Sequence, residues 1–223
     1  CYSLWENKFM KKLYRLNDEN LAVSDVPSRT FHTDDMPQQL SDRVPRGIEL
    51  EENRIFFYCP VGDHEALEVN RLLRRLDIEM QYLSNRLDCK PVPIHLHIHS
   101  PGGSVFAGLS IYDTIKSCKS AVHTYVDGSA ASAATLLSVA GKKRLISKNS
   151  FMLLHQQHLE WAGKLDDFRD EIENQKSLTE KIRQIYLENT KMNEETLDEL
   201  LKHEFWLNSD KCLELGLVDS IFG

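Results

Sequence analysis

The sequence predicts an α/β fold built from repeated β-α units, because strand-like and helix-like segments alternate along most of the chain. Apolar runs such as "RIFFYCPV", "VPIHLHIHS" and "AVHTYV" have the composition of buried strands. Each run precedes a segment whose apolar residues recur at helical spacing. Since strands joined through a helix run parallel, this order predicts a parallel sheet with crossover helices.

The expected elements begin near Ile48. The first strand lies in "RIFFYCPV" and is followed by a helix over "HEALEVNRLLRRLDIEMQYL". A second strand, "VPIHLHIHSPGGSV", is broken by glycines and leads into a helix over "FAGLSIYDTIKSC". The third strand, "AVHTYV", leads into a helix over "SAASAATLLSVAG" that ends at Gly141. Two strand-like pieces, "RLISK" and "FMLLH", follow this helix.

A long helix is expected from Leu165 to Asn189, long enough to project from the body of the protein. Its apolar residues fall on one stripe and its charges elsewhere, as in an amphipathic helix. The stripe consists of Phe168, Ile172, Leu178, Ile182 and Ile185. A short helix over 194–202, a strand in "EFWLNS", a helix in "DKCLELG" and a strand in "LVDSIF" are expected after it.

The first 47 residues differ from the rest and predict an N-terminal extension ahead of a globular domain over residues 48–223. "LWENKFMKKLYRL" is typical of a short basic amphipathic helix, which would dock on the body or bind a partner or a membrane surface. Pro27, Pro37 and Pro45 then interrupt regular structure, so this stretch is expected to be a linker or an extended arm. Because its apolar content is low, we expect the extension to be dispensable for folding.

The net charge of −7 over 223 residues disfavours binding to nucleic acid, which normally requires a basic face. No stretch of the sequence approaches the ~20 consecutive apolar residues of a membrane-spanning helix. The five cysteines are widely spread and show no C-x-x-C pairing, which is typical of reduced thiols in a cytosol-like compartment. We therefore expect a cytoplasmic protein whose partners are neither nucleic acid nor membrane.

The segment "VDGSAASAATLLSVAG" places three serines directly after a predicted strand. With Asp127 and Gly128 as a turn, Ser129 is expected to cap the following helix and Ser132 to lie in its first turn. There, unpaired backbone N–H groups and the helix dipole favour an alkoxide and a neighbouring oxyanion. Ser132 is thus the candidate nucleophile, with a packing role as the alternative, whereas Ser138 lies too deep in the helix to meet a substrate.

Two further features complete a candidate nucleophilic site. The adjacent Gly102 and Gly103, at the carboxyl end of a buried strand, allow backbone N–H groups to face a ligand. They could donate to an oxyanion together with the backbone of Ala133, and an ordinary strand-to-helix turn is the alternative. His155 ends the strand "FMLLH" at the same edge, where it would serve as the base for Ser132 or be a hydrogen-bonded edge histidine.

Four segments, "SPGGSVFAGLSIYDTI", "GSAASAATLLSVAGKKR", "NSFMLLHQ" and "NSDKCLELGLVDSI", resemble in order and spacing the signatures of the Clp protease proteolytic subunit (ClpP) family. The resemblance covers residues 48–222. It implies a ClpP/crotonase-like α/β fold with a projecting handle helix. It also implies that Ser132 is the nucleophile, that His155 is the base, and that Gly103 and Ala133 form the oxyanion hole.

The same resemblance implies a serine endopeptidase that degrades unfolded polypeptides inside a homo-oligomeric chamber. Two stacked seven-membered rings, interlocked by the handle helix, would form this chamber. A Clp-type AAA+ ATPase is the implied partner, and ATP would enter only through it, because the proteolytic subunit takes no cofactor and no metal. The implied compartment is the cytoplasm, an organellar stroma or matrix, or a host cytoplasm for a phage or viral member.

Three features depart from the family pattern. Glu204 occupies the position of the family's triad acid, which is an aspartate, and Asp198 and Asp210 are the alternative acids. Lys202 and His203 replace an Asp-Arg pair that makes ring contacts in the family, so these contacts are expected to differ. The Pro-rich extension replaces a short axial loop, so docking to an ATPase does not follow from the resemblance alone.

Other functions compete with this interpretation. His95, His97 and His99 lie on one face of a predicted strand at ~6.5–7 Å intervals, from which two histidines can share a metal in a metallohydrolase. A packed, hydrogen-bonded sheet face is the alternative for these residues.

A crotonase-type acyl-CoA enzyme needs no serine–histidine pair, and an inactive ring subunit usually lacks the serine or the histidine. The presence of both Ser132 and His155 argues against these two functions. The chain order serine, histidine, acid and the lack of a G-x-S-x-G motif exclude an α/β-hydrolase.

Overall fold

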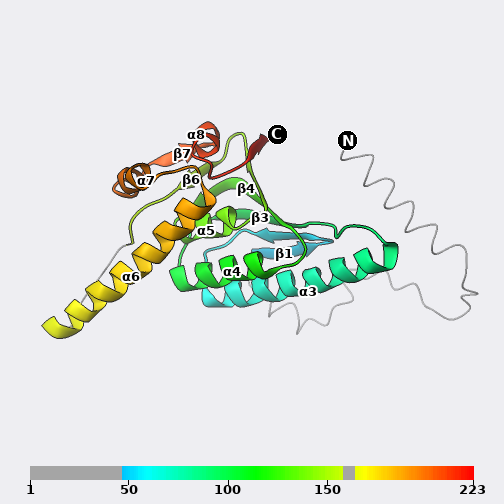
Figure 1. Cartoon of the computed structure of the whole chain (residues 1–223), viewed down its shortest axis with the longest axis horizontal. Helices are drawn as coiled ribbons and strands as arrows, with labels where there is room; N and C mark the ends of the chain where they lie inside the picture. Colours follow the sequence, from blue (N-terminus) through cyan, green and yellow to red (C-terminus); the bar gives the residue numbers. More distant parts are fainter. Residues whose placement is uncertain (1–46, 158–163) are drawn as a thin grey trace, which may run out of the picture. The chain divides into compact units, whose positions relative to one another are not determined.

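The computed structural model describes residues 47–157 and 164–223 of the chain. These residues form a mixed α/β structure, as predicted (Figure 1). The predicted amphipathic helix and Pro-rich arm lie within residues 1–46 and are therefore outside the described residues.

One sheet of eight strands forms the centre of the described chain (Figure 1). Strands β2, β3, β4, β5 and β8 lie side by side in this order and are parallel, and β1 is antiparallel to β2 at one edge. The end of β4 pairs in parallel with β6, which pairs antiparallel with β7. The strands are β1 (Ile48–Glu51), β2 (Arg54–Phe57), β3 (Ile94–Ser100), β4 (Val122–Ala131), β5 (Lys143–Ser147), β6 (Phe151–Leu153), β7 (Trp206–Asn208) and β8 (Ser220–Phe222).

The predicted parallel order is confirmed for β2, β3, β4, β5 and β8, and the sheet has two antiparallel pairs in addition. β1, which was not predicted, is joined to β2 by only Glu52 and Asn53, and so short a connection can join only antiparallel strands. β7 begins at Trp206 opposite Leu153, the last residue of β6. The start of β7 thus lies beside the end of β6, and β7 runs in the opposite direction to β6.

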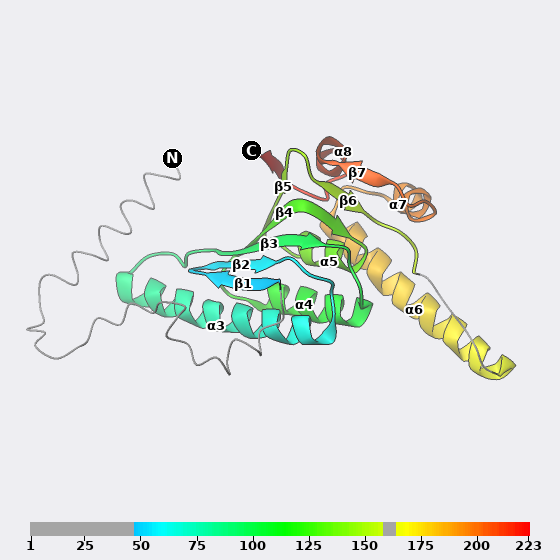
Figure 2. The same ribbon diagram turned by 180° about the vertical axis from the view of Figure 1, so that it is seen from behind.

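The helices fall into two groups. Helices α3 (Asp63–Leu87), α4 (Val105–Ser117) and α5 (Ala133–Val139) cover one face of the sheet (Figures 1 and 2). Helix α6 (Leu165–Asn189) packs against α5 and α7 (Glu194–Leu201), and α8 (Ser209–Glu214) packs beside β6 and β7. No helix in the described ranges is long and apolar enough to cross a membrane.

The hydrophobic core lies between the sheet and the layer of α3, α4 and α5. Alternate side chains of β3 point into it, because successive residues of a strand face opposite sides. Burial of each such aliphatic side chain contributes ~1.5–3 kcal/mol to folding. Fully buried examples are Ile94, Leu96 and Ile98 from β3, with Leu73, Ile111 and Leu137 from the helices.

β4 is longer than predicted, and this shifts the start of the next helix. The predicted turn at Asp127 and Gly128 and the predicted cap at Ser129 are wrong, because the strand continues to Ala131. Its last three residues pair with β6, which extends the strand beyond the apolar run that the sequence displays. Helix α5 therefore begins only after Ser132, which occupies the N-cap position.

Helix α6 has the predicted bounds and the predicted projection (Figures 1 and 2). Its C-terminal part is seated on the body, where Ile185 and Tyr186 are buried. Its N-terminal part extends away from the sheet, and the apolar Ile172 and Leu178 on it are only partly covered. The amphipathic stripe is thus divided between an anchored end and a projecting end.

Candidate active site

Two paired strands bring the predicted serine and histidine to the same edge of the sheet. β4 and β6 are parallel and paired up to Ala131 and Leu153, so the residues that follow leave the sheet together. Ser132 comes directly after Ala131, and its backbone N–H donates to the Leu153 carbonyl at 2.8 Å. His155 lies two residues beyond Leu153. The carboxyl edge of parallel strands, where both residues lie, is the usual place for sites in α/β sheets.

Ser132 adopts a strained backbone conformation at the junction between β4 and α5, with φ 52° and ψ −127°. Such a conformation costs ~1–3 kcal/mol for a residue with a side chain and is found preferentially at functional sites. Within the described chain, the hydroxyl makes no capping hydrogen bond to α5 and is therefore not committed to the helix. The strand–serine–helix geometry is that of a nucleophile elbow, although the G-x-S-x-G motif is lacking.

Ser138 and three of the described cysteines do not fit the role of nucleophile. Ser138 is completely buried in α5, as predicted. The four described cysteines form no disulfide. Burial raises the pKa of Cys59 and Cys212 to about 12 and that of Cys118 to about 11, so these thiols stay protonated at neutral pH and are poor nucleophiles.

The glycine pair passes directly beside the serine backbone. Gly102 and Gly103 have φ of 90° and 147°, conformations that favour glycine. A Cβ added to Gly102 would lie 2.7 Å from Ser132 Cβ and 3.1 Å from Ala133 N. The N–H of Gly102 donates to Ser100 Oγ at 3.2 Å, so the N–H of Gly103 is the first candidate oxyanion donor. The N–H of Ala133, in the first turn of α5, is the second candidate donor.

His155 and Glu204 meet across the antiparallel pair of β6 and β7. Leu153 pairs with Trp206 in antiparallel register. His155, two positions after Leu153, therefore faces Glu204, two positions before Trp206. His155 Nδ1 is accordingly 3.7 Å from Glu204 Oε1, an ion-pair distance longer than a hydrogen bond. The histidine side chain is 16% exposed and the carboxylate 61% exposed.

The two alternative acids are placed elsewhere. Asp198, on α7, makes an ion pair with Arg183 of α6. Asp210 lies on α8 and is exposed. Glu204 is therefore the acid that the geometry favours as the partner of His155.

The three histidines of β3 lie on the face of the sheet opposite the helical layer and contact β4. His95 Nδ1 is 2.8 Å from the Tyr125 hydroxyl, and His97 Nδ1 is 2.7 Å from the Asp127 carboxylate. His99 Nδ1 accepts a hydrogen bond of 3.2 Å from the β4 backbone. This confirms a packed, hydrogen-bonded sheet face. Among residues 47–157 and 164–223, no group of three potential metal ligands lies close enough to hold a metal ion.

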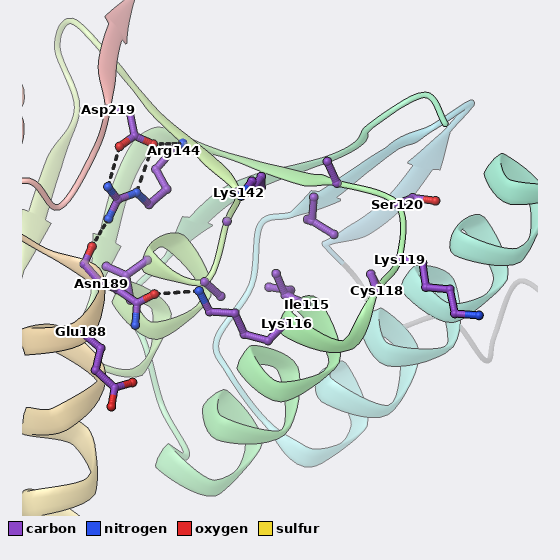
Figure 3. A pocket seen from close by; sticks show the side chains of 15 residues that line it. Ile115, Lys116, Cys118, Lys119, Ser120, Lys142, Arg144, Glu188, Asn189 and Asp219 are labelled. Atoms are coloured by element: carbon purple, nitrogen blue, oxygen red, sulfur yellow. Dashed lines mark hydrogen bonds and ion pairs between the residues drawn. The ribbon is translucent and has the colours of Figure 1, made fainter. Parts of the chain in front are cut away.

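A pocket of about 550 Å³ lies at the opposite end of the sheet (Figure 3). Its lining includes Val122, which is the first residue of β4, whereas Ser132 follows the last residue of that strand. Lys116 and Arg144 in this pocket donate to the side-chain and main-chain oxygens of Asn189. Asn189 ends α6, so these polar groups fasten that helix to the body.

The chain is similar to known proteases over most of its length. The family model described as Clp protease matches residues 47–223. The "ATP-dependent Clp protease proteolytic subunit 1" of Chlamydia muridarum is 31% identical over 194 residues, which covers 84% of this chain and 94% of that protein. The protein of the same name from Chlamydia trachomatis has the same identity and coverage. A solved structure of a ClpP1 mutant from Listeria monocytogenes matches with a TM-score of 0.63 and 28% identity, covering 74% of this chain and 88% of that chain.

Proposed function

Because the chain belongs to the Clp protease family and is a ClpP-type serine endopeptidase, we propose that Ser132, His155 and Glu204 are its catalytic triad. The backbone N–H groups of Gly103 and Ala133 form the oxyanion hole. The observation that carries this proposal is the strained Ser132, held beside the glycine pair and bonded to the segment that bears the histidine.

Each triad member has a role in acyl transfer. His155 accepts the proton of the Ser132 hydroxyl as its oxygen attacks the scissile carbonyl carbon, and then gives that proton to the departing amine. Water hydrolyses the resulting acyl-enzyme by the same proton transfers. Since Nδ1 of His155 faces Glu204, Nε2 is the nitrogen that serves the serine. The carboxylate fixes this tautomer and stabilises the imidazolium that forms.

The oxyanion hole stabilises the negative oxygen of both tetrahedral intermediates. Removal of one such donor typically lowers turnover by ~10²–10³-fold. The N–H groups of Gly103 and Ala133 come from two segments that lie side by side. One is the loop that contains Gly102 and Gly103, called the glycine loop below, and the other is the first turn of α5. This chemistry uses only protein groups, in keeping with a cofactor-independent family.

ClpP-family proteases work as oligomeric chambers together with Clp ATPases. For this chain we propose two stacked seven-membered rings, with the projecting part of α6 as the contact between them. Partly covered apolar residues on a projecting helix support this, because such surfaces mark interaction sites. Unfolded polypeptides are the proposed substrates, and an AAA+ ATPase is the partner proposed to deliver them.

The free thiols fit a reducing compartment, such as the cytoplasm or an organellar matrix.

Hydrolysis of a fluorogenic peptide by purified protein tests the site assignment. Ser132→Ala should abolish turnover while leaving the native mass unchanged, because it removes only the nucleophilic oxygen. Ser129→Ala is the matched control, since Ser129 lies in β4 three residues earlier and should tolerate the change. Loss of turnover in Ser129→Ala with normal turnover in Ser132→Ala would reverse the assignment of the two serines.

A further inference from the structure

Two buried hydroxyl groups connect α6 to the peptide unit that follows Ser132. Thr135, in α5, is completely buried, and Tyr186, in α6, is 3% exposed. Thr135 Oγ1 lies 2.6 Å from the Ser132 carbonyl oxygen and 2.6 Å from the Tyr186 hydroxyl. Neither residue was predicted to belong to the site, and they are 51 positions apart in the sequence.

The number of protons on these groups fixes the direction of the hydrogen bonds. A carbonyl oxygen can only accept, so the single hydroxyl proton of Thr135 is donated to Ser132. Tyr186 must then donate to Thr135 Oγ1. The same Ser132 carbonyl also accepts the backbone N–H of Thr135 at 3.0 Å, so two donors hold it. Burial raises the pKa of Tyr186 to about 12, which keeps its proton in place at neutral pH.

These bonds orient the peptide unit that carries the proposed oxyanion donor. A trans peptide is planar, with its C=O and N–H pointing in opposite directions. With the Ser132 carbonyl held by Thr135 inside α5, the N–H of Ala133 points the other way. The glycine loop lies near this nitrogen, because a Cβ on Gly102 would be 3.1 Å from it. The hydroxyl and the backbone N–H of Thr135 hold the Ser132 carbonyl oxygen and thereby keep ψ of Ser132 at −127°, although this backbone conformation is strained.

The position of Tyr186 is itself fixed by the end of α6. Asn189, three residues later, accepts a 2.7 Å hydrogen bond from Lys116 Nζ and donates a 3.0 Å bond to the Tyr112 hydroxyl. Arg144 donates to the carbonyl oxygen of Asn189, and Figure 3 shows it and Lys116 reaching that residue. Three residues are about one helical turn, so this anchor holds Tyr186 in register with Thr135.

We infer that Thr135 and Tyr186 are positioning residues, which lock the Ser132–Ala133 peptide so that the Ala133 N–H faces the oxyanion. This inference rests on the proposed roles of Ser132 and Ala133. It adds the hydrogen bonds that fix the direction of the Ala133 N–H. Neither hydroxyl touches the substrate. Their loss lets the strained peptide rotate, which weakens stabilisation of the transition state more than binding of the substrate.

Peptidase kinetics of four single variants test this inference. Thr135→Val removes the hydroxyl with little change of volume, and kcat should fall ~10–100-fold while KM stays within ~2-fold, since a lost oxyanion donor costs up to ~10³-fold. Thr135→Ser keeps the hydroxyl and should restore most of kcat. Tyr186→Phe should lower kcat by a smaller factor. Thr124→Val is the matched control, because Thr124 also donates from a buried hydroxyl to a carbonyl of α5, that of Ser138, which lies six residues beyond Ser132.

A second measurement separates positioning from a loss of stability. A peptide boronic acid forms a negatively charged tetrahedral adduct, so its inhibition constant should rise in Thr135→Val and Tyr186→Phe by about the factor by which kcat/KM falls. Losses in the double variant should be less than additive in free energy, since both hydroxyls act through one carbonyl. If Thr135→Val does not fold, Tyr186→Phe and Thr135→Ser decide the outcome.

These experiments distinguish failure of the proposed active site from failure of the positioning role alone. Turnover that survives Ser132→Ala overturns the proposed active site itself. If Ser132→Ala is inactive but Thr135→Val and Tyr186→Phe keep normal kcat and normal boronate inhibition, only the positioning role is overturned. The same conclusion holds if Thr124→Val lowers kcat as much as Thr135→Val does, because the loss is then a general effect of disturbing α5.

Discussion

The replacement of Glu204 by glutamine tests the acid of the triad, which is where this chain departs from its family. The substitution keeps the size of the side chain and removes its charge. A carboxylate near His155 stabilises the imidazolium that forms in the transition state, and an amide does not. Turnover should therefore fall while Ser132 and the assembly stay intact.

The structure sets the size of the expected loss. Two unit charges 3.7 Å apart interact by ~1.1 kcal/mol in water and by ~4.5 kcal/mol at an effective dielectric constant of ~20. Glu204 is 61% exposed and His155 only 16%, so the interaction lies between these limits. A value of ~2.5 kcal/mol corresponds to nearly 10²-fold in rate. This is smaller than the ~10⁴-fold loss found for a fully buried triad aspartate.

The assay is kcat for a fluorogenic peptide at saturating concentration, with native mass measured for each variant. Glu199→Gln is the matched control, because Glu199 also contacts a histidine, His203, at 3.3 Å, whereas the ion pair of His155 is with Glu204. It should leave kcat unchanged, and Glu204→Asp should be tolerated far better than Glu204→Gln. A kcat for Glu204→Gln within ~3-fold of wild type, with the assembly unchanged, would refute the reasoning and indicate a Ser132–His155 dyad.

Three further predictions concern the glycine loop, the handle helix and pH. Gly102→Ala should lower both kcat and the melting temperature, because the new Cβ would lie 2.7 Å from Ser132 Cβ at a φ of 90°. Glutamate at both Ile172 and Leu178 should reduce the native mass, since each apolar side chain buried in a contact contributes ~1.5–3 kcal/mol. The melting temperature should fall as pH is lowered from 7 towards 4.5, because burial lowers the pKa of His95 to about 4. The unfolded histidine takes up its proton near pH ~6.5, so this stability is complete above that pH and is lost as pH falls towards the folded pKa.

Each of these predictions has its own control. Asn174→Glu combined with Ser177→Glu adds the same two charges at exposed positions of α6 and should leave the native mass unchanged. Equal dissociation in this variant would count against an apolar contact. His95→Gln should flatten the dependence of the melting temperature on pH, and an unchanged slope would assign the effect to other groups. Normal kcat in Gly102→Ala would show that the glycine loop does not need its close approach to Ser132.

The helices of the fold were predictable because their signals are local. The bounds of α6 follow from its apolar stripe, and α3 and α4 from runs with helical period. The junction at Ser132 was not predictable in detail. β4 extends beyond its apolar run because it pairs with β6, some 20 residues later in the chain, and no local pattern in "VDGSAAS" encodes that pairing.

The site residues were found by two different routes. Ser132 and His155 stand out by their places at strand ends, whereas Glu204 stood out only through its position in the family pattern. Its approach to His155 depends on the antiparallel register of β6 and β7, which the sequence did not predict. Thr135 and Tyr186 gave no signal, because their contact depends on how α6 packs on α5.

The identity of the nucleophile is the central claim, and labelling with a fluorophosphonate tests it most directly. This reagent reacts with an activated serine, and mass spectrometry of peptides from the labelled protein locates the adduct. A single adduct on Ser132, lost in Ser132→Ala and retained in Ser129→Ala, is the result that we predict. An adduct on Ser129 or on another residue, or an enzyme that cleaves peptides but leaves Ser132 unlabelled, would contradict the account.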